Sequence, residues 1–323
     1  MDRSIDGGNQ YPIVSICCTT YNHARFIRQC MDGFLQQKTS FPIEVLIHDD
    51  ASTDGTQDII REYEKKYPNI VKPIYQIENQ YSKGVKVSLV YNYSRARGKY
   101  IALCEGDDYW TDPYKLQKQV DFLESHPDYV MCSHRYNSYK ESINKLFYDN
   151  SPDYQGEVYD LNYLIHGGWC FQPLSVVYRF DALDRHNYNK CKYSMDAVLF
   201  YEILKNGKGF CLPNIMAVYR VHHGGIWSEV GMNRQRMMEF KARLSIYEVE
   251  RSKEAAIFLL NQFTKLMSRL WMLKHPELFW CVGKILTKYF GLGFTLRLFG
   301  NKLFLDKNWK WGSKIFLSQP HNE

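Results

Sequence analysis

The chain has 323 residues, of which 45% are hydrophobic and 24% charged, and its formal net charge is +6. This composition excludes a disordered or fibrous chain and allows two domains. The positive charge is local: residues 241–323 hold 14 Lys and Arg and 6 Asp and Glu, leaving 27 of 41 and 29 of 35 elsewhere. The first 240 residues are therefore slightly acidic, and no nucleic-acid partner is expected.

Strands and helices are predicted to alternate along the first hundred residues. Apolar, β-branched runs predict strands at 13–18, 41–47, 71–76 and 100–104. Apolar residues at helical spacing predict helices at 26–35, from Asp54 to Pro68, and at 84–96. Gln57 stands three residues after Asp54, which predicts a capping box at the start of the second helix. Alternation at this spacing is typical of a doubly wound, mostly parallel α/β sheet.

The second half of the chain is less regular. A helix is predicted after Pro113, with further strands at 129–132, 175–178 and 216–221 and a helix after Asp196. The stretch 136–195 has weak periodicity, so we expect it to set substrate preference. The segments 259–273 and 278–304 are apolar but interrupted by basic residues, so neither is uncharged over the roughly 20 residues that a bilayer span needs. They fit helices that lie on a membrane surface or helices that pack on a domain.

Nine cysteines are scattered through the chain without a Cys-x-x-Cys pair. Zinc ribbons and thioredoxin chemistry are therefore disfavoured. The first ten residues are polar and lack the apolar centre of a signal peptide. We expect reduced cysteines and a cytoplasmic location. If the basic C-terminal segment binds lipid, the protein would lie on the inner face of the membrane.

Polar residues follow three of the predicted strands. They are Tyr21 and Asn22, then Asp49 and Asp50, then Asp107 and Asp108. Parallel strands end at one edge of a sheet, so these side chains should meet there. Two adjacent carboxylates are costly to bury together unless a cation is present, and Mg²⁺ or Mn²⁺ would also bind phosphate. A solvated acidic turn is the simpler alternative for Asp107 and Asp108 alone.

The segments 14–22, 48–56 and 105–110 resemble, in order and spacing, the family 2 glycosyltransferases of GT-A fold. The resemblance covers about residues 11–225. It implies a nucleotide-sugar donor, most simply a UDP-sugar, a divalent metal (Mn²⁺ or Mg²⁺) and transfer with inversion. It also suggests a nucleotide-sugar-binding half at 1–110 and an acceptor-binding half at 111–230. The basic, amphipathic composition of the remaining residues predicts a helical extension at 231–323.

The resemblance assigns roles to seven residues. For the nucleotide, Asp50 would hydrogen-bond the base, Tyr21 would stack on it with Thr19 alongside, and Asp107 would lie on the ribose side. For catalysis, Asp108 would bind the metal, Asp196 would be the general base, and His222 would bind the metal or the diphosphate. Three of these residues also have a simpler interpretation: Asp196 as a helix cap, His222 as a loop residue and Tyr21 as core packing. Trp110 would stack on an acceptor or cover the site.

The chain also departs from the family pattern. Met195 stands where many members carry a second acid, and His48 and Ala51 are unusual enough to affect base preference. The Gln-x-x-Arg-Trp signature of processive synthases is absent, which favours transfer of a single sugar. The acceptor would be a saccharide, lipid-linked if the basic extension binds a membrane, as in surface polysaccharide or glycolipid assembly.

Three other functions fit the sequence less well. A nucleotidyltransferase would need a Gly-rich, basic phosphate loop, and residues 19–24 contain neither Gly nor Lys. A non-catalytic nucleotide-sugar-binding relative would have lost acids that are intact at Asp50, Asp108 and Asp196. A dinucleotide oxidoreductase would need Gly-x-Gly-x-x-Gly after its first strand, which is missing.

Overall fold

The structure is a computed structural model, and it describes residues 11–148, 158–166, 168, 171–193, 195–225, 230–266 and 276–296. The chain folds into two compact units. One runs to Leu164 and continues from Gly168 to Val230; the other holds Ile165–Gly167 and resumes at Gly231.

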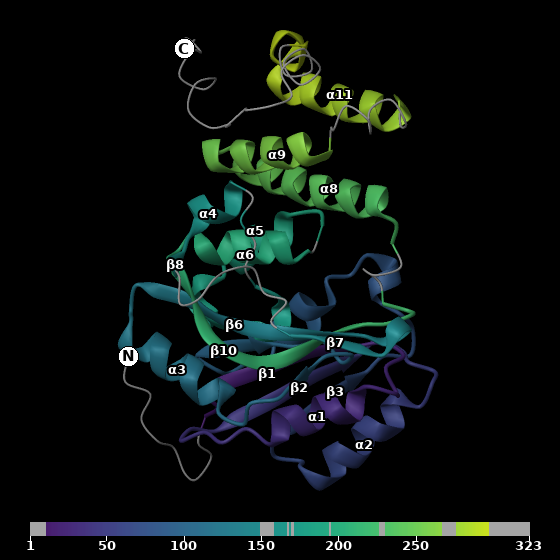
Figure 1. The fold of residues 1–323 in the computed structure, drawn as a ribbon, viewed down its shortest axis with the longest axis vertical. Helices are drawn as coiled ribbons and strands as arrows, with labels where there is room; N and C mark the ends of the chain where they lie inside the picture. The colour runs from purple at the N-terminus through teal and green to yellow at the C-terminus, as the bar shows by residue number, and fades with distance from the viewer. Residues whose placement is uncertain are drawn as a thin grey trace. The chain divides into compact units, whose positions relative to one another are not determined.

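The first unit is built on a ten-stranded mixed sheet (Figure 1). Its main path runs β3-β2-β1-β4-β9-β6-β10-β5. The strands are β1 (Val14–Thr20), β2 (Ile43–Asp49), β3 (Val71–Tyr75), β4 (Tyr100–Leu103), β5 (Tyr109–Trp110), β6 (Tyr129–Lys140), β7 (Lys145–Phe147), β8 (Val158–Tyr159), β9 (Val177–Arg179) and β10 (Lys208–Val221). β1 to β4 are mutually parallel where they pair, and β9 runs antiparallel between β4 and β6. The predicted α/β class with a mostly parallel sheet is confirmed.

Helices cover both faces of this sheet (Figure 1). They are α1 (Ile27–Leu35), α2 (Thr56–Lys66), α3 (Lys115–Ser125), α4 (Leu161–Ile165), α5 (Arg185–Lys190) and α6 (Asp196–Leu204). Val14, Ile16 and Cys18 of β1 share one buried cluster with the apolar faces of α1, α2 and α3. Because side chains alternate along a strand, Ser15 and Cys17 face the other side, where they are also buried. Burial on both faces explains why the strands read as continuous apolar runs.

Short helical turns complete the first unit. They are η1 (Tyr81–Lys83), η2 (Ser88–Tyr93), η3 (Glu141–Ile143), η4 (Pro173–Ser175) and η5 (Phe180–Ala182). The helix predicted over 84–96 is only η2, a π-helical turn. The Asn92 side chain donates to the Cys18 carbonyl oxygen (3.0 Å), and Arg95 donates to the carbonyl oxygens of Lys72 and Ile47. These tertiary bonds tie the segment to the sheet and end the helix early.

Two other predictions need correction. α2 begins at Thr56 after Gly55, whose φ is 96°, so Asp54 is not its N-cap. The predicted capping box is wrong, because the Gln57 side chain donates to Asp49 Oδ1 (2.7 Å) instead. β6 and β10 are also much longer than the predicted 129–132 and 216–221, since they pair along most of their length.

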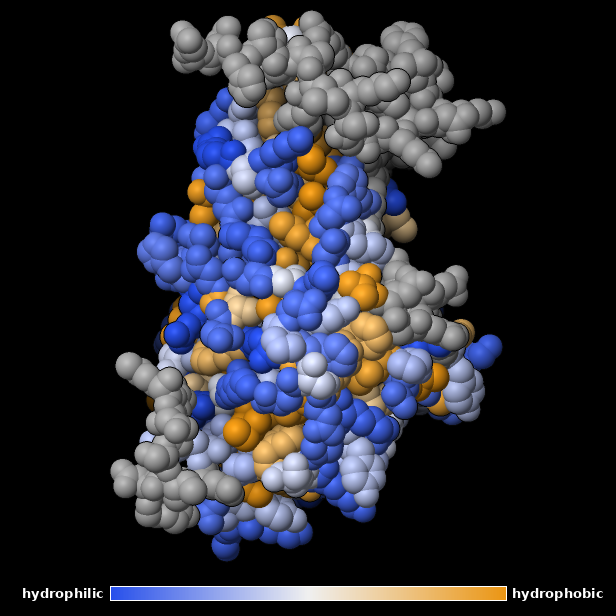
Figure 2. Space-filling model, turned by 90° about the vertical axis from the view of Figure 1, so that its left-hand side faces the viewer, coloured by the Kyte–Doolittle hydropathy of each residue, from blue (hydrophilic) through white to orange (hydrophobic). Residues whose placement is uncertain are grey.

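The second unit is helical in its described part. Its helices are α8 (Met232–Glu250), α9 (Lys253–Leu266) and α11 (Pro276–Phe290). Phe240, Phe263 and Leu286 belong to its core. No described helix is long and apolar enough to cross a bilayer. Parts of the segments 259–273 and 278–304 lie outside the described residues. On the face in Figure 2, hydrophilic residues predominate and hydrophobic ones form patches among them.

The cysteines of the described residues form no disulfide with one another. Cys281 is exposed, and the others are buried: Cys17, Cys18, Cys30, Cys104, Cys132, Cys191 and Cys211. Burial raises the pKa of the Cys30 and Cys104 thiols. These thiols act as small core side chains beneath the ends of β1 and β4, where Cys30 Sγ donates to the Glu105 carbonyl oxygen (3.5 Å).

Candidate active site

The ends of β1 and β2 are tied together by reciprocal hydrogen bonds. The Asn22 amide donates to Ser52 Oγ (2.8 Å), and the Thr53 amide donates to Asn22 Oδ1 (2.9 Å). Asn22 and Ala51 both have left-handed backbones, with φ of 55° and 67°. This conformation suits Asn but strains Ala. The two strand ends are therefore one fixed platform with local strain beside Asp50.

The Asp54 side chain connects the turn after β1 to the turn after β2 by hydrogen bonds. Its Oδ2 accepts from the Ala24 amide (2.9 Å), and its Oδ1 accepts from the amide and hydroxyl of Thr56. Thr56 Oγ1 in turn accepts from the His23 amide (2.9 Å). These bonds hold the pKa of the Asp54 carboxyl below its ordinary value despite the opposing effect of partial burial. The Asp54 carboxylate is therefore fully used in supporting the backbone around His23.

Asp50 is buried and also accepts from backbone amides. Oδ1 accepts from the Gln80 amide (2.7 Å) and Oδ2 from the Tyr81 amide (2.9 Å). Asp50 thus anchors η1 over the end of β2. The neighbouring Asp49 uses one oxygen for Ser52 and Gln57, so it is a structural partner at the strand end.

Gly106 brings the loop after β4 against the end of β1. Its amide donates to the Thr19 carbonyl oxygen (3.0 Å). A Cβ at this position would lie 2.4 Å from Thr20 Oγ1, so only glycine fits here. This close approach fixes where the following Asp107 and Asp108 point.

The two adjacent acids of this loop point to different partners. Asp108 is buried, and its Oδ1 accepts from the Arg220 amide (2.8 Å) of β10. Arg220 also donates from its guanidinium to the Asp107 carbonyl oxygen and lies 4.3 Å from the centre of the Tyr109 ring. β10 therefore holds the loop in place, and Asp108 serves that junction.

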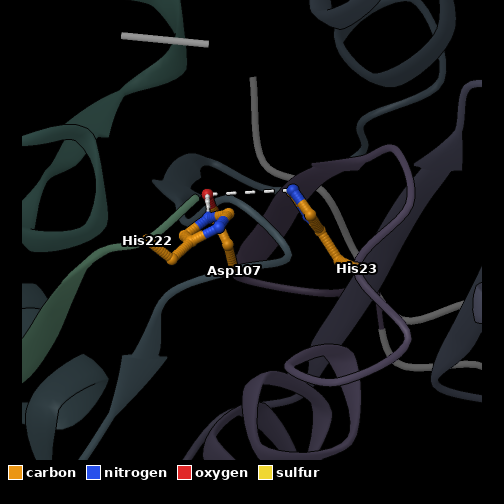
Figure 3. Close-up of side chains that lie close together, drawn as sticks. All are labelled: His23, Asp107 and His222. Atoms are coloured by element: carbon orange, nitrogen blue, oxygen red, sulfur yellow. Dashed lines mark hydrogen bonds and ion pairs between the residues drawn. The ribbon is translucent and has the colours of Figure 1, made fainter. Parts of the chain in front are cut away.

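Asp107 meets two histidines from distant parts of the chain (Figure 3). Asp107 Oδ2 lies 3.1 Å from His222 Nε2 and 3.8 Å from His23 Nε2. His222 follows β10, and His23 belongs to the platform after β1. The three ligand-type atoms all lie within 4.8 Å of one another. Among the residues that the structure describes, none donates a hydrogen bond to the buried Asp107 Oδ1.

The charges around Asp107 separate the pKa values of the neighbouring groups. Burial opposes ionisation of Asp107, but His222 and His23 outweigh it and hold the pKa of this carboxyl low. The pKa of His222 is raised by its bond to Asp107. Burial, and then the charge of Asp107, raises the pKa of Asp108 well above its ordinary value. The loop therefore presents one ionised carboxylate, Asp107, to the two imidazoles.

Glu105 and Asp196 bring further acidity to this region. Each residue as a whole is exposed, yet the protein packed around the carboxyl groups raises the pKa of Asp196 to about 6 and that of Glu105 to about 8. The charges of Asp107 and Asp196 add to the shift at Glu105. Burial raises the pKa of Tyr219, and so do Asp108, Glu105, Asp107 and Asp196. Tyr219 on β10 therefore marks a point near which these acids gather.

Trp110 closes the base of the loop rather than facing an acceptor. It is 1% exposed, its Nε1 donates to the Leu174 carbonyl oxygen (2.9 Å), and its ring meets Phe34 edge-on. The buried Lys115 Nζ lies 4.0 Å from the Trp110 ring centre and donates to Gln119 Oε1 (2.8 Å). Burial lowers the pKa of Lys115 to about 7.

The structure thus brings together some of the residues named from the sequence. Asp107 and His222 are in contact, and Asp196 lies within electrostatic reach of Glu105. Tyr21 is 42% exposed at the end of β1, which suits a ligand contact better than core packing. Thr19 is half-buried beside it. Asp108, named as the metal ligand, accepts a hydrogen bond from the Arg220 amide through its Oδ1.

Two residues of the site were missed from the sequence. His23 follows the polar strand end 19–22, which was the only signal for it. Glu105 belongs to the acidic string before Asp108, but no role was assigned to it. The donor set His23, Asp107 and His222 fits a divalent metal, since neutral imidazoles and a carboxylate are ordinary ligands of such ions.

Comparison with known proteins gives a consistent result. Residues 15–186 match the profile described as glycosyl transferase family 2. A protein of Mycobacterium tuberculosis is 35% identical over 262 residues, which cover 76% of this chain and 71% of that protein. The Escherichia coli enzyme WfaP, named UDP-Glc:alpha-D-GlcNAc-diphosphoundecaprenol beta-1,3-glucosyltransferase, is 30% identical over 219 residues, covering 66% of this chain and 79% of WfaP.

Solved structures share the fold at low sequence identity. TarS of Staphylococcus aureus, residues 1–349 in complex with UDP-GlcNAc, has a TM-score of 0.64 and 16% identity. The match covers 90% of this chain and 88% of that structure. At this identity the likeness establishes the fold alone.

Proposed function

The chain belongs to glycosyl transferase family 2 and is a glycosyltransferase that uses a nucleotide-sugar donor, and we propose that it transfers one sugar from a UDP-sugar to a hydroxyl group, with a divalent metal and with inversion. The observation that carries the proposal is the meeting of Asp107 with His222 and His23 at the ends of β4, β10 and β1. Parallel α/β sheets bind ligands at this edge. The UDP-Glc in the name of WfaP supports a UDP-sugar.

The nucleotide would lie on the platform at the ends of β1 and β2. We assign the base to Tyr21 and Asp50, with Thr19 alongside. Tyr21 is exposed enough to stack on a ring. Each Asp50 oxygen accepts one backbone amide and retains a second lone pair, while the same bonds hold Gln80 and Tyr81 beside it.

The diphosphate would lie over Asp107. A divalent ion held by Asp107 and His222 would supply Lewis-acid stabilisation of the leaving nucleoside diphosphate. We therefore propose Asp107 as the metal ligand in place of Asp108, because only Asp107 faces the histidines. Asp108 positions Asp107 by fixing the loop on the Arg220 amide.

Asp196 is the proposed general base. It stands in the first turn of α6, and its pKa of about 6 leaves it ionised at neutral pH and able to take a proton. A base on the acceptor side would deprotonate the attacking hydroxyl while the diphosphate leaves from the opposite face of the sugar. A single displacement of this kind inverts the anomeric centre.

The acceptor is proposed to be a saccharide on a lipid carrier at the inner membrane face. WfaP supports this choice, since its name specifies a diphosphoundecaprenol-linked acceptor. In the second unit, Trp280, Leu292 and Leu296 are at least 60% exposed. Lys284 and Lys288 of α11 are exposed as well. Exposed apolar and basic side chains on one short segment are typical of a surface that contacts anionic lipid.

A nucleotide panel tests the donor site. Thermal unfolding would be followed with UDP, GDP, dTDP and CMP, each with and without Mn²⁺. We expect UDP with Mn²⁺ to give the largest stabilisation. Tyr21→Ala should weaken UDP binding by about tenfold or more, as base stacking on an aromatic ring is worth about 1–3 kcal/mol. Tyr114→Ala, a similarly exposed tyrosine on the chain, is the matched control.

Two results would contradict this donor site. One is the absence of stabilisation by all four nucleotides in the presence of Mn²⁺. The other is a Tyr21→Ala variant that binds UDP as the unmodified protein does. Transfer from UDP-sugars to a GlcNAc-diphospholipid, with the product anomer read by NMR, then tests acceptor and inversion; a product that retains the donor configuration would refute the mechanism.

Vesicle co-sedimentation tests the lipid surface. Binding of the full chain to vesicles that contain anionic lipid would be compared with binding of the Lys284→Glu/Lys288→Glu variant. Charge reversal should abolish most of the binding. Lys65→Glu/Lys66→Glu, a double reversal on exposed residues of α2, is the control. Equal binding by the two variants would refute the assignment to α11.

A further inference from the structure

We propose that His23 is a third protein ligand of the metal site, and that the resulting set of two imidazoles and one carboxylate selects a transition-metal ion over Mg²⁺. The inference deepens the proposed function, and rests on it only in taking the ion to serve the donor diphosphate. The family motifs assign no role to His23.

The distances fit a shared ion. Ligand atoms about 2.1 Å from one metal, at tetrahedral or octahedral angles, are about 3.0 to 3.5 Å apart. His222 Nε2 is 3.1 Å and His23 Nε2 3.8 Å from Asp107 Oδ2. The two imidazole rings stand nearly perpendicular, with centroids 6.0 Å apart, so both edges face the carboxylate (Figure 3). A shift of a few tenths of an ångström would bring His23 Nε2 into this range of Asp107 Oδ2, and all three ligand-type atoms already lie within 4.8 Å of one another.

Both imidazoles are already oriented for this role through their other ring nitrogen. His23 Nδ1 lies 3.1 Å from Thr20 Oγ1, and His222 Nδ1 lies 2.8 Å from the His223 carbonyl oxygen. With the proton on Nδ1, each Nε2 lone pair is directed at the shared position. Metal-binding histidines in proteins usually have such a partner, which fixes ring orientation and tautomer.

The backbone around His23 is fixed as firmly as that of an internal residue. Its amide donates to Thr56 Oγ1 (2.9 Å), and the next amide, of Ala24, donates to Asp54. The Phe26 ring packs against His222 at 4.5 Å and lies 6.3 Å from the His23 ring. A surface histidine that meets an acid by chance would not have all these supports. Asp107 Oδ1, which accepts no bond from a described residue, leaves room for the carboxylate to turn.

The donor set then determines which ion is preferred. Imidazole nitrogen suits Mn²⁺ less than Zn²⁺, Fe²⁺ or Co²⁺ but binds all of them, whereas Mg²⁺ prefers oxygen ligands and retains its water. A site with only Asp107 and His222 would need phosphate oxygens to hold an ion. With His23 added, three protein atoms should hold a transition-metal ion before any nucleotide binds.

The test measures metal binding by the full chain, stripped of metal and free of nucleotide. Mn²⁺ binding is read by loss of the free-ion EPR signal, Co²⁺ by its visible spectrum, and Mg²⁺ by competition. We expect Mn²⁺ and Co²⁺ to bind at least about tenfold more tightly than Mg²⁺. His23→Gln should weaken Mn²⁺ and Co²⁺ binding by at least about tenfold, the lower end of what loss of an outer-sphere partner costs.

Two further variants keep the test independent of folding defects. Thr20→Val keeps the shape of Thr20 but removes the oxygen beside His23 Nδ1, and should weaken Mn²⁺ binding by about 10- to 100-fold. His126→Gln alters an exposed histidine at the end of α3 and should bind metal normally. Circular dichroism would confirm that each variant is folded.

The inference is overturned if folded His23→Gln binds Mn²⁺ as tightly as the unmodified chain, or if Mg²⁺ competes on equal terms. Failure of the proposed function would look different. Metal binding that depends on His23, without stabilisation by UDP, would leave the site standing and refute the UDP-sugar donor.

Discussion

The platform at the ends of β1 and β2 and the loop after β4 are both rich in acids, but they use them in opposite ways. In the platform, Asp50 and Asp54 accept backbone amides through both carboxylate oxygens. In the loop, Asp107 leaves one buried oxygen without a donor from the described residues. Glu105 has a pKa of about 8. Asp54 of the platform therefore holds the fold, whereas Asp107 of the loop is kept for a ligand at a cost to stability.

This difference gives a rule for reading such motifs. An acid whose oxygens are filled by amides has a pKa held down, as in Asp54, whereas an acid crowded by burial and like charge has it raised, as in Asp108. Substitutions should therefore separate the two kinds of acid: changing Asp107 should mainly reduce catalysis, and changing Asp54 should mainly reduce stability.

The largest effect is expected for Asp107→Asn. Removing the charge that faces both histidines should lower the transfer rate by about a thousandfold, because metal stabilisation of the leaving group is worth several kcal/mol. The rate would be measured at saturating Mn²⁺ and UDP-sugar. Asp58→Asn, which alters an exposed acid in the first turn of α2, is the control. A rate for Asp107→Asn equal to that control would refute the division between the regions.

The next largest effect is expected for Asp196→Asn. The transfer rate should fall by about 10²- to 10⁴-fold, which is the usual contribution of a general base. The unmodified enzyme should lose activity as the pH falls below about 6, because the Asp196 carboxyl must be ionised to accept a proton and its pKa is about 6. The residual activity of the variant should lack this acid limb. Persistence of the same limb in the variant would assign it to another group.

Lys115→Met tests the effect on stability of the amine that is buried behind the loop after β4. The unfolded chain keeps this amine protonated up to its ordinary pKa of 10.5, whereas burial lowers the pKa in the fold to about 7. Folding therefore releases a proton between these values, and the unmodified protein should gain stability as the pH rises through them. The variant should be more stable by about 1–3 kcal/mol below pH 7, after loss of the Gln119 bond is counted.

Urea unfolding of both proteins at several pH values between 6 and 10 measures this effect. The stability gain of the variant should shrink as the pH rises. A gain that does not change with pH would show that packing, and not the buried charge, is responsible.

The smallest effect is expected for Asp54→Ala. Loss of its bonds to Ala24 and Thr56 should lower the free energy of unfolding by about 1–2 kcal/mol, with far less effect on transfer than Asp107→Asn. Because the folded pKa of Asp54 lies below the ordinary 3.8, its contribution is complete above that value and is lost as the pH falls through the lower, folded pKa. The difference in the free energy of unfolding between the two proteins should therefore be smaller at pH 3 than at pH 7.

The sequence was sufficient for the alternation of strands and helices and for the meeting of three strand ends at one edge. It did not show that Asp107 contacts the two histidines, because the direction of this side chain depends on the tight approach of Gly106 to Thr20. His23 was missed for a related reason. Its position depends on the left-handed turn at Asn22 and on the amide bond to Thr56, neither of which has a periodic signal.

The long strands were underestimated for a different reason. β10 pairs with β6 through register shifts near Leu212, Ile215 and Val218, so the apolar alternation by which a strand is recognised is interrupted. Those shifts also place Tyr219 and Arg220 against the loop after β4. The register shifts that make β10 hard to recognise in the sequence therefore also help to position residues of the site.

The buried thiols beneath the site report how often the surrounding core opens. Cys18, Cys30 and Cys104 are buried, and their reaction with an alkylating reagent must wait until the layer between α1 and the sheet opens. Cys281 is exposed and would react at once, so every molecule carries its own reference signal. The difference in rate between the two reactions reports the free energy of opening of the core directly below the loop after β4. No residue of the site has to be substituted for this measurement.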